Sequence, residues 1–123
     1  FKWWAMWFVH GEEWFTRRVD RLDMLRRHFL AKVEESPTLH LAAIPTGLNV
    51  LFYALPQQLL AEDGTPDLST TESRAKVAYA SQAARRLLLE QGKWMINYQE
   101  THGVAAPCFR MVFLNSALTT SDM

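Results

Sequence analysis

A strand-like run near the end of the chain, Ala106 to Ser116, constrains the fold more than any other stretch. Side chains on a strand alternate between its two faces, and here both faces are apolar. One face carries Phe109, Met111 and Phe113, and the other carries Cys108, Arg110, Val112 and Leu114. We therefore expect a strand that is buried on one side and at least partly covered on the other.

Arg110 is the exception in this run, because it places a permanent cation among apolar residues. A guanidinium enclosed there needs an anion, since an unpaired buried charge costs several kcal/mol. One interpretation is functional: the planar fork of Arg110 holds a carboxylate. The other is structural: Arg110 lies on an edge strand and extends to water, or it pairs with an internal Asp or Glu. The strand pattern alone favours the structural interpretation.

Composition limits the class of protein. A chain of 123 residues is long enough for one domain with a single core. Thirteen Lys and Arg balance thirteen Asp and Glu, so the charge gives no support for nucleic-acid binding. No apolar run approaches the roughly 20 residues that cross a membrane, and we expect no membrane partner. The single cysteine, Cys108, predicts a reducing, cytoplasmic location and a buried, unreactive thiol.

Two helices are expected in the first 35 residues. Residues 1–8 are rich in aromatic side chains and predict a short helix, buried against a larger protein or a partner subunit rather than anchored in a membrane interface. His10 and Gly11 should break this helix. Residues 12–35 then predict an amphipathic helix that ends before Ser36-Pro37. Its expected apolar face consists of Phe15, Val19, Leu22, Leu25, Phe29 and Val33.

The rest of the chain predicts a sheet and a second long helix. Residues 38–44 and 48–55 read as an antiparallel strand pair, and residues 93–100 as a third strand before the Arg110 strand. Between them, Ser69 and Glu72 form a capping box for a helix that ends at Gly92. Its expected inward residues are Val77, Ala80, Ala84, Leu87 and Leu88. The order predicts an α+β fold: a small antiparallel sheet with helices on one face.

Motifs for several kinds of chemistry are missing from the sequence. Four histidines and one cysteine lack the spacing of metal ligands, so we expect no metal site. His40 is better interpreted as an ordinary surface histidine than as a ligand or base. Neither a glycine-rich phosphate loop nor a Gly-x-Ser-x-Gly elbow occurs.

Four stretches, in the same order along almost the whole chain, carry a resemblance. They are Phe1-Lys2-Trp3-Trp4-Ala5-Met6-Trp7, Asn49 to Pro56, Asn97-Tyr98-Gln99, and Cys108 to Val112 with Asn115 to Thr119. Together they resemble the C-terminal part of the pyridoxal-phosphate-dependent amino-acid decarboxylases, in the branch of glutamate and cysteine sulfinate decarboxylases. The resemblance implies the C-terminal small domain of a fold-type I enzyme. It also implies connecting helices in residues 1–35 and the small domain in residues 36–123, truncated before its last helix.

The same resemblance implies roles for residues. The arginine at the place of Arg110 binds the substrate carboxylate in that family. None of Lys2, Lys32, Lys76 and Lys93 matches the lysine that forms a Schiff base with pyridoxal 5'-phosphate. We therefore expect the cofactor to be bound mainly by a missing upstream domain, with no catalytic and no cofactor-binding residue in this piece. Alone, the piece should be inactive, and the full-length enzyme should be a homodimer.

Two hypotheses follow. The first is the C-terminal part of a carboxy-lyase for an acidic amino acid such as glutamate, cysteine sulfinate or aspartate. The second is a stand-alone α+β module that binds an amino acid or mediates dimerisation without catalysis. Five tryptophans in so small a free domain would leave an exposed apolar patch, which argues against the second hypothesis.

Overall fold

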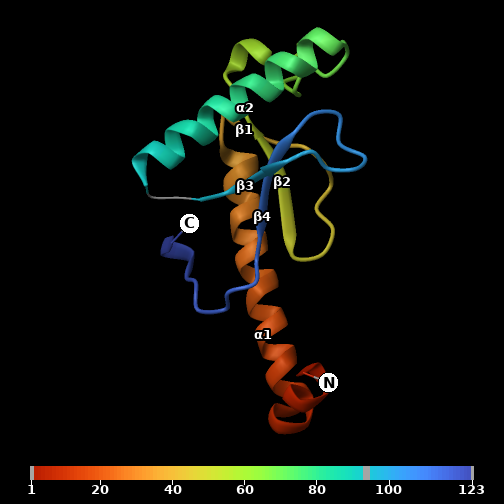
Figure 1. Cartoon of the computed structure of the whole chain (residues 1–123), viewed down its shortest axis with the longest axis vertical. Coiled ribbons are helices and arrows are strands. Elements are labelled where there is room, and N and C mark those ends of the chain that lie inside the picture. Colours follow the sequence, from red (N-terminus) through yellow and green to blue (C-terminus); the bar gives the residue numbers. More distant parts are fainter. Residues whose placement is uncertain (1, 93–94, 123) are drawn as a thin grey trace.

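The computed structural model describes residues 2–92 and 95–122. Its helices are α1 (Lys2–Glu35) and α2 (Thr71–Gln91), with short 3-10 turns at Gln57–Leu59 and Thr120–Asp122. Its strands are β1 (Leu39–Leu41), β2 (Asn49–Ala54), β3 (Asn97–Gln99) and β4 (Cys108–Val112). The strands form one antiparallel sheet in the order β1-β2-β4-β3 (Figure 1). The predicted α+β class and its antiparallel sheet are confirmed.

The two outer strands are shorter than predicted. β1 and β3 span three residues each, whereas the sequence predicted strands over 38–44 and 93–100. Both strands form edges of the sheet, where only one neighbour supplies ladder hydrogen bonds. Residues 93–94 of the predicted third strand lie outside the described residues.

A break divides α1 at Gly11, as the sequence predicted. Gly11 has φ 73° and ψ 171°, a conformation that residues with a Cβ avoid. The aromatic segment therefore folds back, and the ring of Trp7 stacks on that of Phe15 with centroids 4.9 Å apart. Figure 1 shows this part of α1 projecting away from the sheet. In the described ranges 2–92 and 95–122, no helix is both long and apolar enough to span a membrane.

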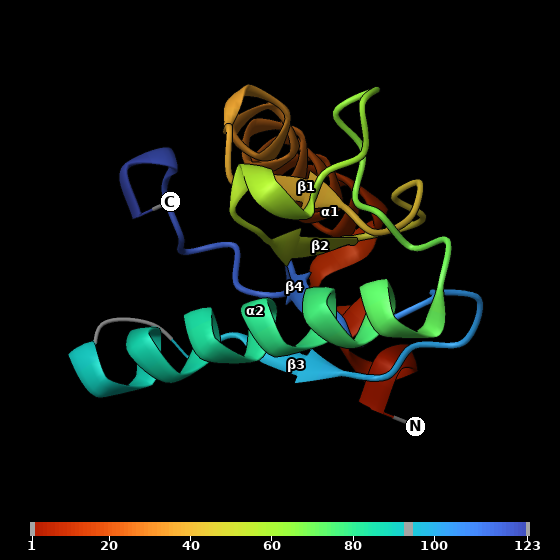
Figure 2. The same ribbon diagram turned by 90° about the horizontal axis from the view of Figure 1, so that it is seen from above.

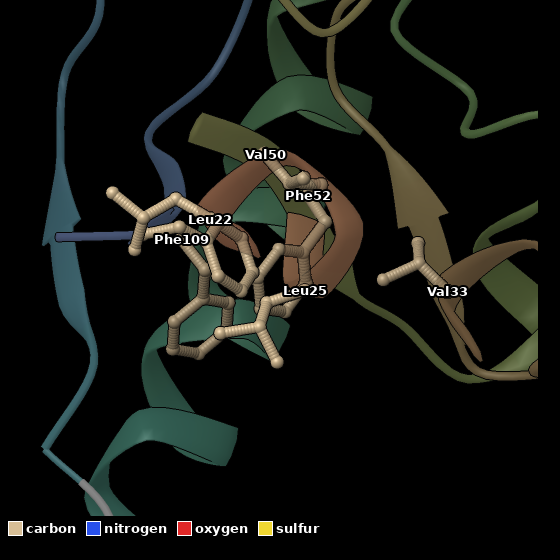
Figure 3. Close-up of a cluster of buried hydrophobic side chains, with 7 residues drawn as sticks. Leu22, Leu25, Val33, Val50, Phe52 and Phe109 are labelled. Carbon is tan, nitrogen blue, oxygen red and sulfur yellow. The ribbon is translucent and has the colours of Figure 1, made fainter. Parts of the chain in front are cut away.

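The apolar face of α1 covers one face of the sheet only along its second half. Leu22, Leu25 and Val33 are buried, but Val19 is 51% exposed, so its predicted inward position is wrong. Figure 1 shows that α1 lies against the sheet along only part of its length, so helical periodicity alone does not decide which of its apolar residues are buried. Figure 3 shows the buried cluster, in which the rings of Phe52 and Phe109 stack 5.3 Å apart.

The start of α2 differs by one residue from the predicted capping box. Thr70 is the N-cap and exchanges hydrogen bonds with Ser73, whereas the sequence predicted Ser69 with Glu72. The hydroxyl of Ser69 instead donates to Asp67 at 2.6 Å, so it is not available to cap the helix. The predicted end is confirmed, because Gly92 adopts a left-handed conformation with φ 66°.

Helix α2 runs across one end of the sheet (Figures 1 and 2). The Ser81 hydroxyl accepts from the backbone N–H of Ala54 at 3.3 Å, at the end of β2. Leu88 lines an apolar groove with Phe29 and Phe52. Leu87 is 59% exposed, so its predicted inward position is wrong. Neighbouring helical residues are rotated by about 100°, and the helix that turns Leu88 inward turns Leu87 outward.

Two leucine substitutions test this account of the core. Leu25→Ala should lower the free energy of unfolding by about 2–5 kcal/mol, because Leu25 is fully buried beneath the sheet. Leu87→Ala removes the same atoms from an exposed site and should change it by less than about 0.5 kcal/mol. Urea denaturation of both variants measures the difference; equal destabilisation would contradict the assigned positions.

Candidate anion-binding site

Arg110 lies in the interior of the sheet. Its strand, β4, is hydrogen-bonded to β2 on one side and β3 on the other. Arg110 is directly opposite Leu51 on β2 and Asn97 on β3. Paired residues of an antiparallel sheet point to the same face, so these three side chains share one face. The alternative of an edge-strand arginine is therefore excluded.

The guanidinium of Arg110 has no partner among residues 2–92 and 95–122. It appears in none of their ion pairs or side-chain hydrogen bonds, although the side chain is partly buried. Some other arginines are held by ion pairs or hydrogen bonds. For example, Arg26 binds Asp23 at 2.7 Å, and Arg21 donates to the carbonyl of Ser116 at 2.7 Å. Arg110 is therefore a cation with its donors available, and the alternative of an internal ion pair does not occur in this part of the chain.

The face that carries Arg110 is apolar at one end. Tyr53 and Cys108 are buried there, and the Tyr53 hydroxyl donates to the carbonyl of Ala106 at 3.4 Å. Burial raises the pKa of Tyr53 to about 12 and also raises the pKa of the Cys108 thiol. Both groups are thus neutral near pH 7, and the predicted burial of the Cys108 thiol is confirmed. A charge near this wall is poorly screened, so an anion gains more from Arg110 there than in open water.

Two amide side chains on β3 lie on the same face as Arg110 and were not predicted as site residues from the sequence. Asn97 and Gln99 lie on the Arg110 face, and Asn97 Nδ2 donates to Gln99 Oε1 at 3.1 Å. The signal was present in the alternation Asn97-Tyr98-Gln99, which puts both amides on one face. The alternation alone does not say which face of the sheet the amides occupy. The register of β3 against β4 decides this, because it pairs Asn97 with Arg110.

His40 is the other residue whose surroundings differ from expectation. It lies on β1 opposite Tyr53 and is half-buried, not a surface histidine. Its Nε2 atom is buried and has no hydrogen-bond partner within the described residues. No group of metal ligands occurs in that same part of the chain.

The described lysines do not fit a site for a Schiff-base cofactor. Lys32 pairs with Glu35, and Lys76 pairs with Glu72, both on exposed helix surfaces. Lys2 lies in the exposed first helix, and Lys93 lies outside the described residues.

Comparisons with known proteins give a consistent picture. No family model matches the chain. It is 33% identical over 122 residues to human cysteine sulfinic acid decarboxylase, covering 99% of this chain and 24% of that protein. It is 25% identical to the mouse acidic amino acid decarboxylase GADL1, covering 100% of this chain and 21% of that protein. The crystal structure of mouse CSAD superposes with a TM-score of 0.76 at 26% identity, over 98% of this chain and 24% of that one.

The chain thus spans about a quarter of the length of the curated relatives it matches. The comparisons confirm the resemblance of this chain to the pyridoxal-phosphate-dependent amino-acid decarboxylases, over about a quarter of the length of those relatives.

Proposed function

We propose that this chain is the C-terminal part of a pyridoxal-phosphate-dependent L-amino-acid decarboxylase, to which it contributes the arginine that binds the substrate carboxylate. One observation carries the proposal: within residues 2–92 and 95–122, Arg110 is a cation without an ion pair or side-chain hydrogen bond, in an interior strand beside an apolar wall. A protein that retains such a charge without an internal counter-ion has a reason to leave it available.

The role of Arg110 is to bind and orient. Its guanidinium offers two parallel N–H donors to a carboxylate, which fixes the plane of that group as well as its position. The sheet holds the backbone of Arg110 through both neighbouring strands, so little ordering remains to be done when the anion binds. Pyridoxal phosphate, when bound, supplies the electron sink for decarboxylation, and the reactive lysine comes from outside this segment.

An acidic amino acid is the substrate class we propose, with glutamate, cysteine sulfinate and aspartate as candidates. Support comes from the relatives named cysteine sulfinic acid decarboxylase and acidic amino acid decarboxylase. We further propose a cytoplasmic location, in keeping with the unpaired, buried Cys108.

The exposed aromatic helix supports a larger assembly over a stand-alone module. Its large apolar side chains are 41–78% exposed: Trp3, Trp4, Met6, Trp7 and Phe8. Such a patch is typical of a surface that another part of the protein, or a second subunit, covers. We propose that it is covered in a homodimeric full-length enzyme.

Arg110→Lys in the full-length enzyme tests the assigned role. A single ammonium cannot reproduce the bidentate contact, so we expect KM to rise, kcat to fall, and kcat/KM to drop by about 100-fold or more. Arg86→Lys is the matched control, because Arg86 is an exposed helix residue paired with Glu90. Steady-state kinetics with glutamate, cysteine sulfinate and aspartate measure both variants. Near-normal kcat/KM for Arg110→Lys would refute the assignment.

Cofactor trapping tests which part of the protein carries the lysine that forms the Schiff base. Full-length protein is incubated with pyridoxal phosphate, reduced with borohydride and digested, and the modified peptide is located by mass. We expect one stoichiometric adduct on a lysine outside residues 1–123. Stoichiometric labelling of Lys2, Lys32, Lys76 or Lys93 would show instead that this segment carries its own Schiff-base lysine.

A further inference from the structure

Tyr98 fixes the orientation of β3. Its hydroxyl donates to the carbonyl of Ala78 on α2 at 2.9 Å, and its ring packs edge-on against Phe109 with centroids 5.5 Å apart. These contacts hold Tyr98 on the face that α1 covers. Because side chains alternate along a strand, Asn97 and Gln99 must then point to the face of Arg110.

The hydrogen bond between these two amides has a direction. Asn97 Nδ2 donates and Gln99 Oε1 accepts, at 3.1 Å. The carbonyl end of Gln99 is thereby occupied, while its Nε2 group has no partner among the described residues 2–92 and 95–122. Gln99 therefore presents N–H donors, and not its carbonyl oxygen, to its surroundings.

The position of Gln99 brings those donors near the guanidinium. Asn97 is directly opposite Arg110, and Gln99 is opposite Cys108, two residues away on the same face. Such diagonal neighbours lie about 7–8 Å apart, within reach of long side chains. The donors of Arg110 and Gln99 therefore lie on one face of the sheet, with the buried Cys108 next to Gln99 on that face.

We propose that Gln99 is a second donor to the carboxylate held by Arg110, and that Asn97 is a positioning residue that keeps the Gln99 amide in its donating orientation. This inference rests on the proposed function and deepens it. Two oxygens of a carboxylate can take the guanidinium fork and still accept a further N–H, because each oxygen has two lone pairs. The amide of Gln99 is neutral and adds a donor without adding a charge. The site therefore carries the single positive charge of Arg110, which matches one carboxylate group of the ligand.

Substitutions at both positions of the full-length enzyme test the proposal, with calorimetric binding of glutarate as the readout. Gln99→Ala should weaken glutarate about tenfold, through loss of one hydrogen bond to a charged group. Gln99→Glu should weaken it about 100-fold, because a new carboxylate beside Arg110 competes for the guanidinium. Gln82→Glu is the matched control: it makes the same chemical change at an exposed residue of α2 and should leave the affinity for glutarate unchanged.

The two Asn97 variants separate positioning from mere support. Asn97→Asp cannot donate to Gln99, and its carboxylate attracts Nε2 instead, which turns the Gln99 carbonyl toward the bound anion. We expect at least tenfold weaker glutarate binding. Asn97→Ala leaves the Gln99 amide free to rotate and should cost only about two- to threefold. Asn97→Asp also adds a carboxylate opposite Arg110, so it is repeated in the Gln99→Ala background. A positioning role predicts a smaller loss of glutarate affinity there than with Gln99 present, whereas the same loss in both backgrounds would show that the added charge acts on Arg110 directly and would overturn the role of Asn97.

The outcomes distinguish this inference from the function on which it rests. Unchanged glutarate affinity in Gln99→Ala and Gln99→Glu, with Arg110→Lys impaired, would overturn the role of Gln99 alone. Failure of the unsubstituted enzyme to bind glutarate, or an unimpaired Arg110→Lys, would overturn the proposed carboxylate site itself.

Discussion

The register of β4 between its two neighbours is the constraint on which the rest of the structure depends. In the observed register, Phe109 and Phe113 join the core under α1, while Arg110 faces the other side. A slip of one residue would exchange the two sets of side chains. It would place an unpaired guanidinium under α1 and expose two aromatic rings, at a cost of several kcal/mol. The same pattern that builds the core therefore also presents the cation.

If Arg110 has the proposed role, one short strand contributes both to the core and to the carboxylate site. An arginine on a loop would need ordering before it could bind, whereas the backbone of Arg110 is held on both sides by ladder hydrogen bonds. The buried end of its face, with Cys108 and Tyr53, keeps the local dielectric low. For the carboxylate-binding role proposed for Arg110, the sheet thus supplies a held backbone and a poorly screened charge.

Much of the fold was predictable because local patterns and tertiary contacts agree. The two faces of the β4 strand, the break at Gly11 and the end of α2 at Gly92 follow from alternation and backbone preference. The predictions were wrong where a local interaction or the extent of the sheet overrode the sequence pattern. Ser69 was taken by a turn with Asp67, so the cap moved to Thr70. Val19 matched the helical period but is 51% exposed, because α1 lies against the sheet along only part of its length.

The candidate site was only half predictable for a similar reason. Arg110 stands out in sequence because a cation among apolar residues needs an explanation. Asn97 and Gln99 do not stand out, since polar residues on a short edge strand are ordinary. Their relation to Arg110 depends on strand order and register, which no spacing in the sequence specifies.

A crystal structure of the full-length protein with bound glutarate tests the central claim most directly. The account predicts a carboxylate of the ligand on the Arg110 face of the sheet, with both oxygens about 3 Å from guanidinium nitrogens. Glutarate bound elsewhere, with Arg110 paired to a carboxylate of the protein itself, would contradict it.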